Sequence, residues 1–489
     1  MIRALIVTTN YPRWEGDPHS PWLLELMGRL REKGYAFDVL APSFKGLRTH
    51  VIGETKVYRF RYAPARWETL THEEGAPNKI RKQPLYLLLL PFYILAGMWA
   101  AWRLGRRGRY DIIHVHWPVP QGLFGALART GDARLVATFY GADLVMARRF
   151  PLLKPFVRWF VRRCDDLAAI SSYTARDLAA IADRQPRIIP YGIHLPPERD
   201  WSATPGRVLT VGRLIARKGH IYLIRAMALL RDLPDAHLVI VGEGHERGAL
   251  EAEIQRLDLT DRVTLTGRVS DQALEAYYQS CQVFALPAIV DESGDTEMLG
   301  MVSLEAMRYC KPVIASDVGG IPDIVVDGES GTLVPQKDPE ALAAAIRRAL
   351  TDPDWARRLG HGGYRFAQTH FSWDRVERAT RAMYAEGSSR RFFNRHPHAR
   401  GEEIADGDKR AISHAGHGGH AEGQRPADQQ HQRAFSHPHA HGKDEGQIPD
   451  EPCAHERSRE LWDEAGGRGR NPPHKTGKAQ SDEQMAEDA

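Results

Sequence analysis

A length of 489 residues indicates two or three domains, and a hydrophobic content of 42% is enough to give them buried cores. The formal net charge is only +4, but residues 1–200 carry 30 Lys and Arg against 18 Asp and Glu, and the rest of the chain has an acidic excess. A basic first part is typical of proteins that meet anionic lipid head groups, a lipid diphosphate or nucleic acid, and it also fits a soluble arginine-rich domain.

The first 200 residues alternate short apolar runs with amphipathic stretches. The N-terminal run, Leu5–Thr9, ends in polar residues, so it predicts a buried strand and not a signal peptide. A turn-rich loop, a helical pattern and a second apolar run at Phe37–Ala41 follow, and this order predicts a parallel α/β sheet. Further strands are expected at Asp111–His116, Leu135–Phe139, Asp166–Ser171 and Arg187–Ile189.

A long uncharged stretch, Leu85–Trp102, interrupts this pattern and is followed closely by four arginines. Its length nearly permits a membrane span, but Pro91 and Gly97 interrupt it, and it lies between strands of one sheet. Three interpretations remain: a helix lying in the membrane interface with a basic rim, a buried core helix, and a true span. We expect the basic first domain and this stretch to offer a surface for the inner leaflet of a membrane.

A second series of strands begins at Arg207–Val211 and ends at Gly331–Val334, with helical segments between the strands. The fold class predicted for the chain is therefore α/β, with two facing Rossmann-like, doubly wound parallel-sheet domains. Ligands of such sheets bind at the carboxyl ends of the strands, and two facing domains would place them in the cleft between the domains.

We place the first domain at residues 1–198 and the second at residues 199–370. A C-terminal helix at residues 371–387 is expected to return to the first domain. Residues 388–489 hold eleven of the 22 histidines and very few aliphatic residues, so this tail is predicted to be disordered. The four cysteines show no Cys-x-x-Cys or Cys/His spacing, which indicates a reducing compartment and no structural zinc.

The loop Val211–Gly219 directly follows a predicted strand and carries two cations at Arg213 and Lys218. Gly212 lets the chain turn closely, so both side chains can project into one site. Arginine can bind a phosphate with two parallel hydrogen bonds and lysine acts as a point charge, so the pair suits a diphosphate. The loop lacks the P-loop spacing, and the alternative is a pair of exposed loop cations.

The stretch from Pro287 to Met307 places two glutamates, Glu297 and Glu305, eight residues apart. Gly300 is expected to open the helix that carries Glu305. The backbone N–H groups of Gly300, Met301 and Val302 can then face an anion or a sugar hydroxyl. Glu297 can accept hydrogen bonds from sugar hydroxyls, and Glu305 from a ribose.

These motifs resemble the donor domain of the glycosyltransferase 4 type, a retaining, nucleotide-sugar-dependent family with the GT-B fold. The resemblance covers about residues 1–386. It is carried by Gly-Arg-(x4)-Lys-Gly from Gly212, the two glutamates, and the segments 313–323 and 331–335. In the first domain it is carried by the segments 10–17, 114–120, 138–143 and 190–194.

The resemblance implies a role for each matching residue. It implies Arg213 and Lys218 on the donor diphosphate, Glu297 with the amides of Gly300–Val302 on the donor sugar, and Glu305 on the ribose. It places Arg268 and Val269 near the base, and it puts Gly16 in the first-domain loop that faces the phosphates. The candidate residues are thus catalytic (Arg213, Lys218, Glu297), donor-binding (Gly212, Arg268, Val269, Gly300, Met301, Val302, Glu305) and acceptor-side (Gly16, His116, Tyr140, Asp143).

One residue departs from the family pattern. Family members often have a histidine where this chain has Tyr140, in the segment that ends at Asp143. A tyrosine can donate a hydrogen bond but is a poor proton shuttle near neutral pH. This puts the acceptor-side chemistry in question, and His114 and His116 are the residues that could compensate.

The resemblance implies a hexosyltransferase that moves a sugar from a nucleoside diphosphate sugar to an acceptor hydroxyl with retention, without a bound metal or cofactor. We expect a lipid-linked or membrane-borne saccharide as the acceptor, in surface polysaccharide biosynthesis, and no nucleic-acid partner. The location expected is the cytoplasm or the cytoplasmic face of the membrane. Two alternatives stay open: a non-catalytic subunit that binds sugar nucleotides, and a nucleotide-sugar epimerase on the same fold.

Overall fold

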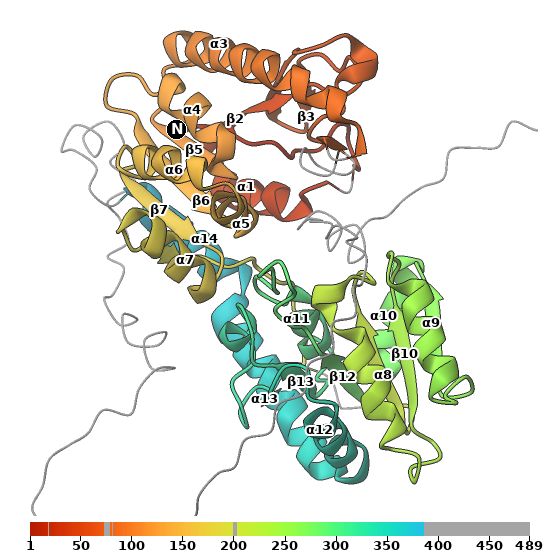
Figure 1. Ribbon diagram of the computed structural model, residues 1–489. Helices are drawn as coiled ribbons and strands as arrows, with labels where there is room; N and C mark the ends of the chain where they lie inside the picture. Colours follow the sequence, from red (N-terminus) through yellow and green to blue (C-terminus); the bar gives the residue numbers. More distant parts are fainter. Residues whose placement is uncertain (18, 73–78, 81, 199–202, 386–489) are drawn as a thin grey trace, which may run out of the picture. The chain divides into compact units, whose positions relative to one another are not determined.

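The computed structural model describes residues 1–17, 19–72, 79–80, 82–198 and 203–385, and within this range the chain forms two α/β domains, each built on one sheet (Figure 1). The prediction of two doubly wound parallel-sheet domains is confirmed. The histidine-rich tail, which the sequence predicts to be disordered, lies outside the described residues.

Eight of the described strands make the sheet of the first domain, in the order β3-β4-β2-β1-β5-β6-β7-β8. All neighbours are parallel except β3 and β4. The central strands β1, β5 and β6 are almost wholly buried because helices cover both faces of such a sheet. The strands are β1 (Ile2–Val7), β2 (Tyr35–Pro42), β3 (His50–Ile52), β4 (Thr55–Phe60), β5 (Ile112–His116), β6 (Arg134–Phe139), β7 (Asp166–Ala169) and β8 (Arg187–Ile188).

The helices of this domain alternate with its strands, and they are α1 (Pro21–Glu32), α3 (Leu90–Gly108), α4 (Pro118–Ala128), α5 (Ala142–Arg149), α6 (Lys154–Val161) and α7 (Ser172–Ala182). The inner faces of α3, α4, α5, α6 and α7 share one core with the sheet. The sequence analysis did not predict the edge hairpin β3–β4. Its signal was present, because Gly53 and Glu54 form a two-residue turn between short runs that contain β-branched residues.

The second domain has six described strands in the order β11-β10-β9-β12-β13-β14, all parallel. They are β9 (Arg207–Val211), β10 (His237–Val241), β11 (Val263–Gly267), β12 (Val283–Leu286), β13 (Val313–Ser316) and β14 (Thr332–Val334). The helices are α8 (His220–Ala228), α9 (Arg247–Arg256), α10 (Asp271–Ser280), α11 (Met301–Met307), α12 (Pro339–Thr351) and α13 (Pro353–Phe371). The six strands predicted for this domain match the six described strands one by one along the chain.

The strand order reverses at one place in each sheet, and this decides where ligands can bind. In the second domain the reversal lies between β9 and β12, and in the first it lies between β1 and β5. The loops that leave two such strands turn to opposite sides and open a crevice at the carboxyl edge of the sheet. The candidate loops of both domains begin at these strand ends.

The last described helix, α14 (Trp373–Ala385), packs against strands and helices of the first domain. The hydroxyl of Tyr384 is 2.8 Å from Nδ1 of His114 on β5, and the guanidinium of Arg134 donates to the carbonyl of Met383 at 3.1 Å. The domain boundary predicted at residues 370 and 371 falls in the last turn of α13, and it stays a prediction.

The long apolar stretch forms a 3₁₀ turn, η2 (Pro84–Leu89), that runs into α3, at the upper edge of the first domain in Figure 1. Among the described residues, Pro84–Gly108 is the one helical segment that is long and apolar enough to cross a membrane. Pro91 stands in the first turn of α3, where its missing N–H has no helical partner to lose. Neither Pro91 nor Gly97 breaks the helix.

Candidate functional site

The donor-side residues lie on the two loops that leave β9 and β12, at the strand reversal of the second sheet. The first loop runs from Gly212 to Gly219 and contains a 3₁₀ turn, η4 (Ala216–Lys218). The second runs from Pro287 to Gly300, which precedes α11. Because β9 and β12 are hydrogen-bonded neighbours, residues far apart in the sequence meet at their ends.

Two glycines let other backbone segments approach the second loop closely, Gly219 from the first loop and Gly319 from the loop after β13. Gly219 has φ of +66°, and a Cβ built on it would lie 1.9 Å from the carbonyl oxygen of Pro287. Gly319 has φ of +58°, and its Cβ would lie 2.0 Å from the carbonyl oxygen of Glu297. A side chain at either position would therefore push the glutamate loop away, both by its volume and by its unfavourable backbone conformation.

Lys218 and Glu297 form a buried ion pair between the two loops. The Nζ of Lys218 lies 2.8 Å from Oε2 of Glu297, and the lysine side chain is fully buried. Arg217 adds a second cation, with Nη1 at 3.1 Å from the same oxygen and Nε at 3.5 Å from a carboxylate oxygen of Asp295. The sequence analysis did not single out Arg217, although it stands next to Lys218.

The charges of this cluster depend on one another. Burial alone would raise the pKa of Glu297, but Lys218 and Arg217 lower it to about 2, so the carboxylate is ionised at neutral pH. Burial lowers the pKa of Lys218, and Glu297 opposes this effect. Arg217 also pairs with Asp295, so these four groups nearly balance. The further positive charge that a diphosphate requires comes from the buried Arg213, whose charge also acts on Lys218.

The other predicted donor residues occupy different places around this ion pair. Gly212 adjoins the lysine, since a Cβ on it would lie 3.3 Å from Cε of Lys218. Arg213 is buried, and its carbonyl accepts a hydrogen bond from His220 at 3.2 Å. The segment Gly300–Val302 forms the start of α11.

Glu305, Arg268 and Val269 lie outside the two donor loops. Glu305 lies on α11 and accepts a hydrogen bond from the hydroxyl of Tyr278 at 2.7 Å. Arg268 is exposed and Val269 half-buried, directly after β11. Their assignments to ribose and base remain predictions, and Tyr278 is a neighbour that the sequence did not indicate.

The acceptor-side residues His116 and Tyr140 meet at the carboxyl ends of β5 and β6. The hydroxyl of Tyr140 is 2.6 Å from Nδ1 of His116, and both side chains are buried. Burial, followed by the charge of His114, lowers the pKa of His116, and burial raises the pKa of Tyr140. Both groups are therefore neutral, and they share one hydrogen bond whose direction is set by the tautomer of the imidazole.

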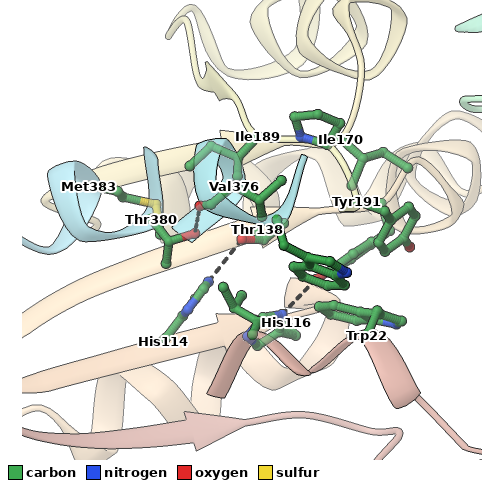
Figure 2. Close-up of a pocket in the computed structure, with 14 residues that line it drawn as sticks. Trp22, His114, His116, Thr138, Ile170, Ile189, Tyr191, Val376, Thr380 and Met383 are labelled. Carbon is green, nitrogen blue, oxygen red and sulfur yellow. Dashed lines mark hydrogen bonds between the residues drawn. The ribbon is translucent and has the colours of Figure 1, made fainter. Parts of the chain in front are cut away.

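The pocket around this pair, which α14 helps to close, is too small for a sugar. It has a volume of about 20 Å³, enough for roughly one water molecule. Figure 2 shows Trp22, Tyr191 and His116 close together at one side of it. The ring of Tyr140 also stacks on Trp117, with centroids 4.4 Å apart, and Trp117 is the partly exposed member of this cluster.

Gly16 and Asp143 occupy two other loops of the first domain. Gly16 is exposed, in a loop where the guanidinium of Arg13 donates to the buried Asp17 at 2.7 Å. Asp143 stands in the first turn of α5, and one carboxylate oxygen accepts from the backbone N–H of Tyr140 at 3.3 Å. Its other oxygen is buried and has no hydrogen-bond partner among the described residues.

Replacing Asp143 with Asn should remove a pH dependence of stability. Burial raises the pKa of Asp143 from 3.8 to about 7. Between these two pH values the unfolded chain has released a proton that the folded chain still holds, so the free energy of unfolding falls as the pH rises through this window. Thermal unfolding followed at several pH values from 4 to 8 tests this.

In that experiment the variant should gain stability over the native chain as the pH rises, and the gain should level off above about pH 7. The variant Asp132→Asn, which changes an exposed carboxyl group, serves as the matched control. Its stability should change with pH in the same way as that of the native chain. Parallel curves for Asp143→Asn would contradict the assignment.

Two doubly wound domains, with paired cations and a carboxylate at the strand reversal of the second, define a glycosyltransferase of the GT-B fold. The chain belongs to glycosyltransferase family 4. The family described as Glycosyltransferase Family 4 matches residues 22–195, and the one described as Glycosyl transferases group 1 matches residues 195–366. The chain is thus an enzyme that takes its sugar from a nucleotide-sugar donor.

Two relatives of known activity are mannosyltransferases. The chain is 29% identical over 389 residues to a GDP-mannose-dependent α-(1-6)-phosphatidylinositol monomannoside mannosyltransferase of Mycolicibacterium smegmatis, covering 76% of this chain and 94% of the relative. It is 30% identical over 315 residues to an MMP α-(1→4)-mannosyltransferase of Mycolicibacterium hassiacum, covering 58% of this chain and 73% of the relative.

Solved structures support the same fold. Sucrose-phosphate synthase from Thermosynechococcus elongatus matches with a TM-score of 0.62 and 24% identity, covering 81% of this chain and all of that one. HepE of Anabaena, crystallised with UDP and glucose, matches with a TM-score of 0.55 and 18% identity, covering 78% of this chain and 98% of that one.

Proposed function

We propose that the chain transfers a hexosyl unit, with mannose as the first candidate, from a nucleoside diphosphate sugar to a hydroxyl of a lipid-linked saccharide, and that the anomeric configuration is retained. The observation that carries this proposal is the buried contact of 2.8 Å between Lys218 and Glu297 at the strand reversal of the second sheet. The relative from M. smegmatis, whose name gives GDP-mannose as donor and a phosphatidylinositol monomannoside as acceptor, supports the choice of sugar and acceptor class.

The ion pair suggests how the site prepares for the donor. Without a donor, Glu297 holds the ammonium of Lys218 and the guanidinium of Arg217 in place, so these cations need no reorganisation when a diphosphate arrives. As the bond from the sugar to the diphosphate breaks, negative charge grows on the departing phosphate, and the cations stabilise it. Glu297 can then accept a hydrogen bond from a hydroxyl of the donor sugar.

The retaining outcome follows from attack on the same face that the diphosphate leaves. In this arrangement the leaving phosphate takes the proton of the acceptor hydroxyl, so no side chain has to act as a nucleophile. His116 and Tyr140 are neutral and buried, which fits a supporting role for them and not that of a proton shuttle.

The outer face of η2 and α3 supports a membrane-borne acceptor. The inner face of α3 is made of Tyr93, Gly97, Ala101 and Gly105, which repeat every four residues and are buried. A Cβ on Gly97 would lie 2.3 Å from the ring of Phe124, and one on Gly105 would lie 2.2 Å from the carbonyl oxygen of Ala128. Small residues thus face α4, and the large side chains are turned outward.

The large apolar side chains of the segment form an outward face that the protein leaves uncovered. Leu95 and Trp99 are 63% and 59% exposed, and the whole apolar face consists of Leu85, Leu87, Leu88, Phe92, Leu95, Trp99 and Trp102. The interpretation of this stretch as a buried core helix is therefore wrong for the outer half of the helix. A contiguous exposed apolar face of this kind typically meets a membrane or another protein.

We assign this face to the interface of an anionic membrane. The arginines at the end of α3 lie against its aromatic side chains, with Arg103 at 5.1 Å from the ring centre of Trp99 and Arg106 at 4.5 Å from that of Trp102. Aromatic rings with a cationic rim suit the level of the lipid head groups. The two sheet strands that flank this segment, β4 and β5, belong to one sheet, so a helix lying in the interface suits the fold better than a span.

The proposed reaction is tested by incubating the purified chain with GDP-mannose or a UDP-hexose and octyl α-mannoside, a soluble analogue of a lipid-linked sugar. We expect a disaccharide product whose new linkage has the anomeric configuration of the donor, as read from the one-bond carbon–proton coupling in NMR. A product of opposite configuration would refute retention. Absence of product with every donor, on this acceptor and on a membrane lipid extract, would refute the proposed reaction.

A further inference from the structure

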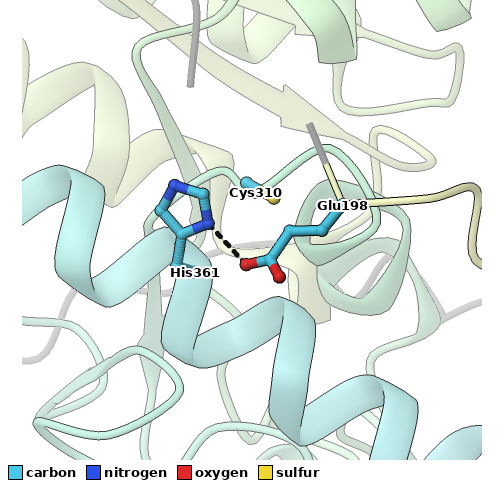
Figure 3. A group of neighbouring side chains, drawn as sticks. All are labelled: Glu198, Cys310 and His361. Carbon is cyan, nitrogen blue, oxygen red and sulfur yellow. Dashed lines mark hydrogen bonds and ion pairs between the residues drawn. The ribbon is translucent and has the colours of Figure 1, made fainter. Parts of the chain in front are cut away.

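Three side chains with metal-binding atoms meet beside the segment that connects the two sheets. Glu198 lies on this segment, Cys310 follows α11, and His361 lies on α13. A carboxylate oxygen, the Sγ and a ring nitrogen all lie within 4.8 Å of one another, and Nδ1 of His361 is 2.6 Å from Oε1 of Glu198 (Figure 3). Figure 3 shows the thiol and the carboxylate on the same side of the imidazole ring.

The backbone around this group is closely packed, which fixes the positions of the three side chains. A Cβ on Gly360 would lie 2.0 Å from the carbonyl oxygen of Cys310, so α13 can approach the turn after α11 only because this residue is a glycine. One turn further along α13, the hydroxyl of Tyr364 donates to the carbonyl of Pro196 at 2.7 Å. Helix α13 is therefore anchored to both of the segments that supply the other two side chains.

The backbone of Cys310 has a conformation that is uncommon for a residue with a side chain. Its φ of +54° is in the left-handed region, at the end of a helix where glycine or asparagine is usual. A cysteine there costs about 1–2 kcal/mol relative to a favourable conformation. Cys310 is buried, and its Sγ lies within contact range of His361 and Glu198.

We propose that Glu198, Cys310 and His361 bind one divalent transition-metal ion, with zinc as the expected occupant. Thiolate, imidazole and carboxylate are all ligands of zinc, and three protein ligands leave a fourth tetrahedral position for water. The hydrogen bond between His361 and Glu198 uses the atoms that the ion would take, so metal binding replaces a proton in this contact. Arg365, at 3.7 Å from Glu198, is 63% exposed and can turn to solvent.

A bound ion would connect three segments that are far apart in the sequence. It would fasten the connecting segment, through Glu198, to the end of α11 and to the middle of α13. Because binding occurs only in the folded chain, it would also raise the stability of this domain, by an amount that grows with the logarithm of the metal concentration once the site is mostly filled. The ion has no part in the transfer reaction, so the expectation of a transfer without metal is unaffected, but a zinc ion here would overturn the expectation of no structural zinc that was drawn from the cysteine spacing.

Cobalt(II) is the probe that tests this site, because a tetrahedral cobalt site absorbs visible light and a cobalt–thiolate bond adds a charge-transfer band in the near ultraviolet. We expect both bands when Co²⁺ is added to the full-length chain, and their loss when Zn²⁺ follows. Cys310→Ala should lose the charge-transfer band. The matched controls Cys164→Ala, Cys281→Ala and Cys453→Ala should keep it, and the last of these also excludes the tail as the source of the thiolate.

The remaining ligands are tested by affinity. Glu198→Gln and His361→Gln should each weaken Co²⁺ binding at least about tenfold, as loss of a ligand or its orienting partner does elsewhere. Zn²⁺ should raise the midpoint of thermal unfolding of the native chain and not that of Cys310→Ala. The proposal is overturned if the native chain gives no charge-transfer band, if Cys310→Ala keeps it, or if His361→Gln binds as tightly as the native chain.

Discussion

Lys218→Met should transfer sugar on the order of 10²–10³ times more slowly than the native chain, which is the loss seen when one charge-stabilising donor is removed from an active site. Methionine keeps the length of the lysine side chain, so the change removes the ammonium group and little else. The loss should appear in kcat, because the negative charge on the departing diphosphate is greatest in the transition state. Initial rates with a saturating nucleotide sugar measure it.

A second variant separates this role from a purely structural ion pair. Removing one partner of a buried pair costs about 3–5 kcal/mol of stability, because it leaves a charge buried with less compensation. Lys218→Met combined with Glu297→Gln removes both charges of this pair, so part of this loss should be recovered while transfer stays slow. The recovery is limited by Arg217, which then keeps only Asp295 of its two carboxylate partners. Recovery of transfer in the double variant would show that the pair supports the fold alone, and a native rate in Lys218→Met would remove the lysine from the mechanism.

Lys311 offers a matched control within the same domain. It is as deeply buried as Lys218, but its ammonium donates to the carbonyl of Gln279 at 2.6 Å, away from the two donor loops. Lys311→Met should therefore lower the thermal stability and leave kcat of the folded fraction unchanged. A loss of kcat equal to that of Lys218→Met would mean that burial of a lysine, and not its place at the strand reversal, explains the effect.

The sequence predicted the fold well because the signal for each strand is local. Central parallel strands are buried on both faces, so runs such as Arg207–Val211 and His237–Val241 stand out as short apolar segments between amphipathic helices. The edge hairpin β3–β4 was missed because His50–Ile52 is only three residues long and partly exposed. The strand order itself cannot be read from such runs, since pairing depends on contacts between distant segments.

The candidate site likewise has a part that the sequence predicted and a part that it did not. Lys218 and Glu297 were proposed from short motifs, and their contact follows once β9 and β12 are known to be neighbours. The second cation on Glu297, Arg217, is not distinguishable from Arg213 by spacing alone, because both precede Lys218 in one loop. Which of them reaches the carboxylate depends on the 3₁₀ turn at Ala216–Lys218.

No local sequence pattern could predict contacts between residues that are far apart in the chain. The contact of His116 with Tyr140 joins the ends of two strands, and the group of Glu198, Cys310 and His361 joins three segments that are far apart in the chain. A search for metal sites by cysteine and histidine spacing cannot find such a group. Only the close approach of α13 to the turn after α11 brings its members together.

Replacing the three outward residues Phe92, Leu95 and Trp99 with Gln should weaken binding to anionic vesicles about 100-fold or more. Each large apolar side chain contributes about 1.5–3 kcal/mol when it is fully withdrawn from water, and a partial insertion of all three gives roughly 3 kcal/mol or more. Glutamine is a good helix former, so α3 should persist. Co-sedimentation with vesicles of phosphatidylglycerol and phosphatidylcholine measures the binding.

The charge contribution is tested separately on the same vesicles. Each arginine near an anionic surface contributes about 1 kcal/mol, so Arg106→Gln combined with Arg107→Gln should weaken binding tens of times, and the native chain should bind far more weakly to pure phosphatidylcholine. Raising the salt concentration should reduce the arginine contribution and spare the apolar one. Val51→Gln, at an exposed apolar residue of the hairpin strand β3, is the matched control and should bind like the native chain.

The outcome also decides between the two partners that an exposed apolar face can have. If the face binds a second copy of the chain, the native protein should be a dimer in solution without lipid, and the triple Gln variant should be a monomer. If it binds a membrane, the native chain should remain monomeric without vesicles, and the triple variant should lose activity on a lipid acceptor in bilayers while keeping it on octyl α-mannoside. Equal losses on both acceptors would contradict a docking role, since the helix would then affect the reaction itself and not the meeting of enzyme and membrane.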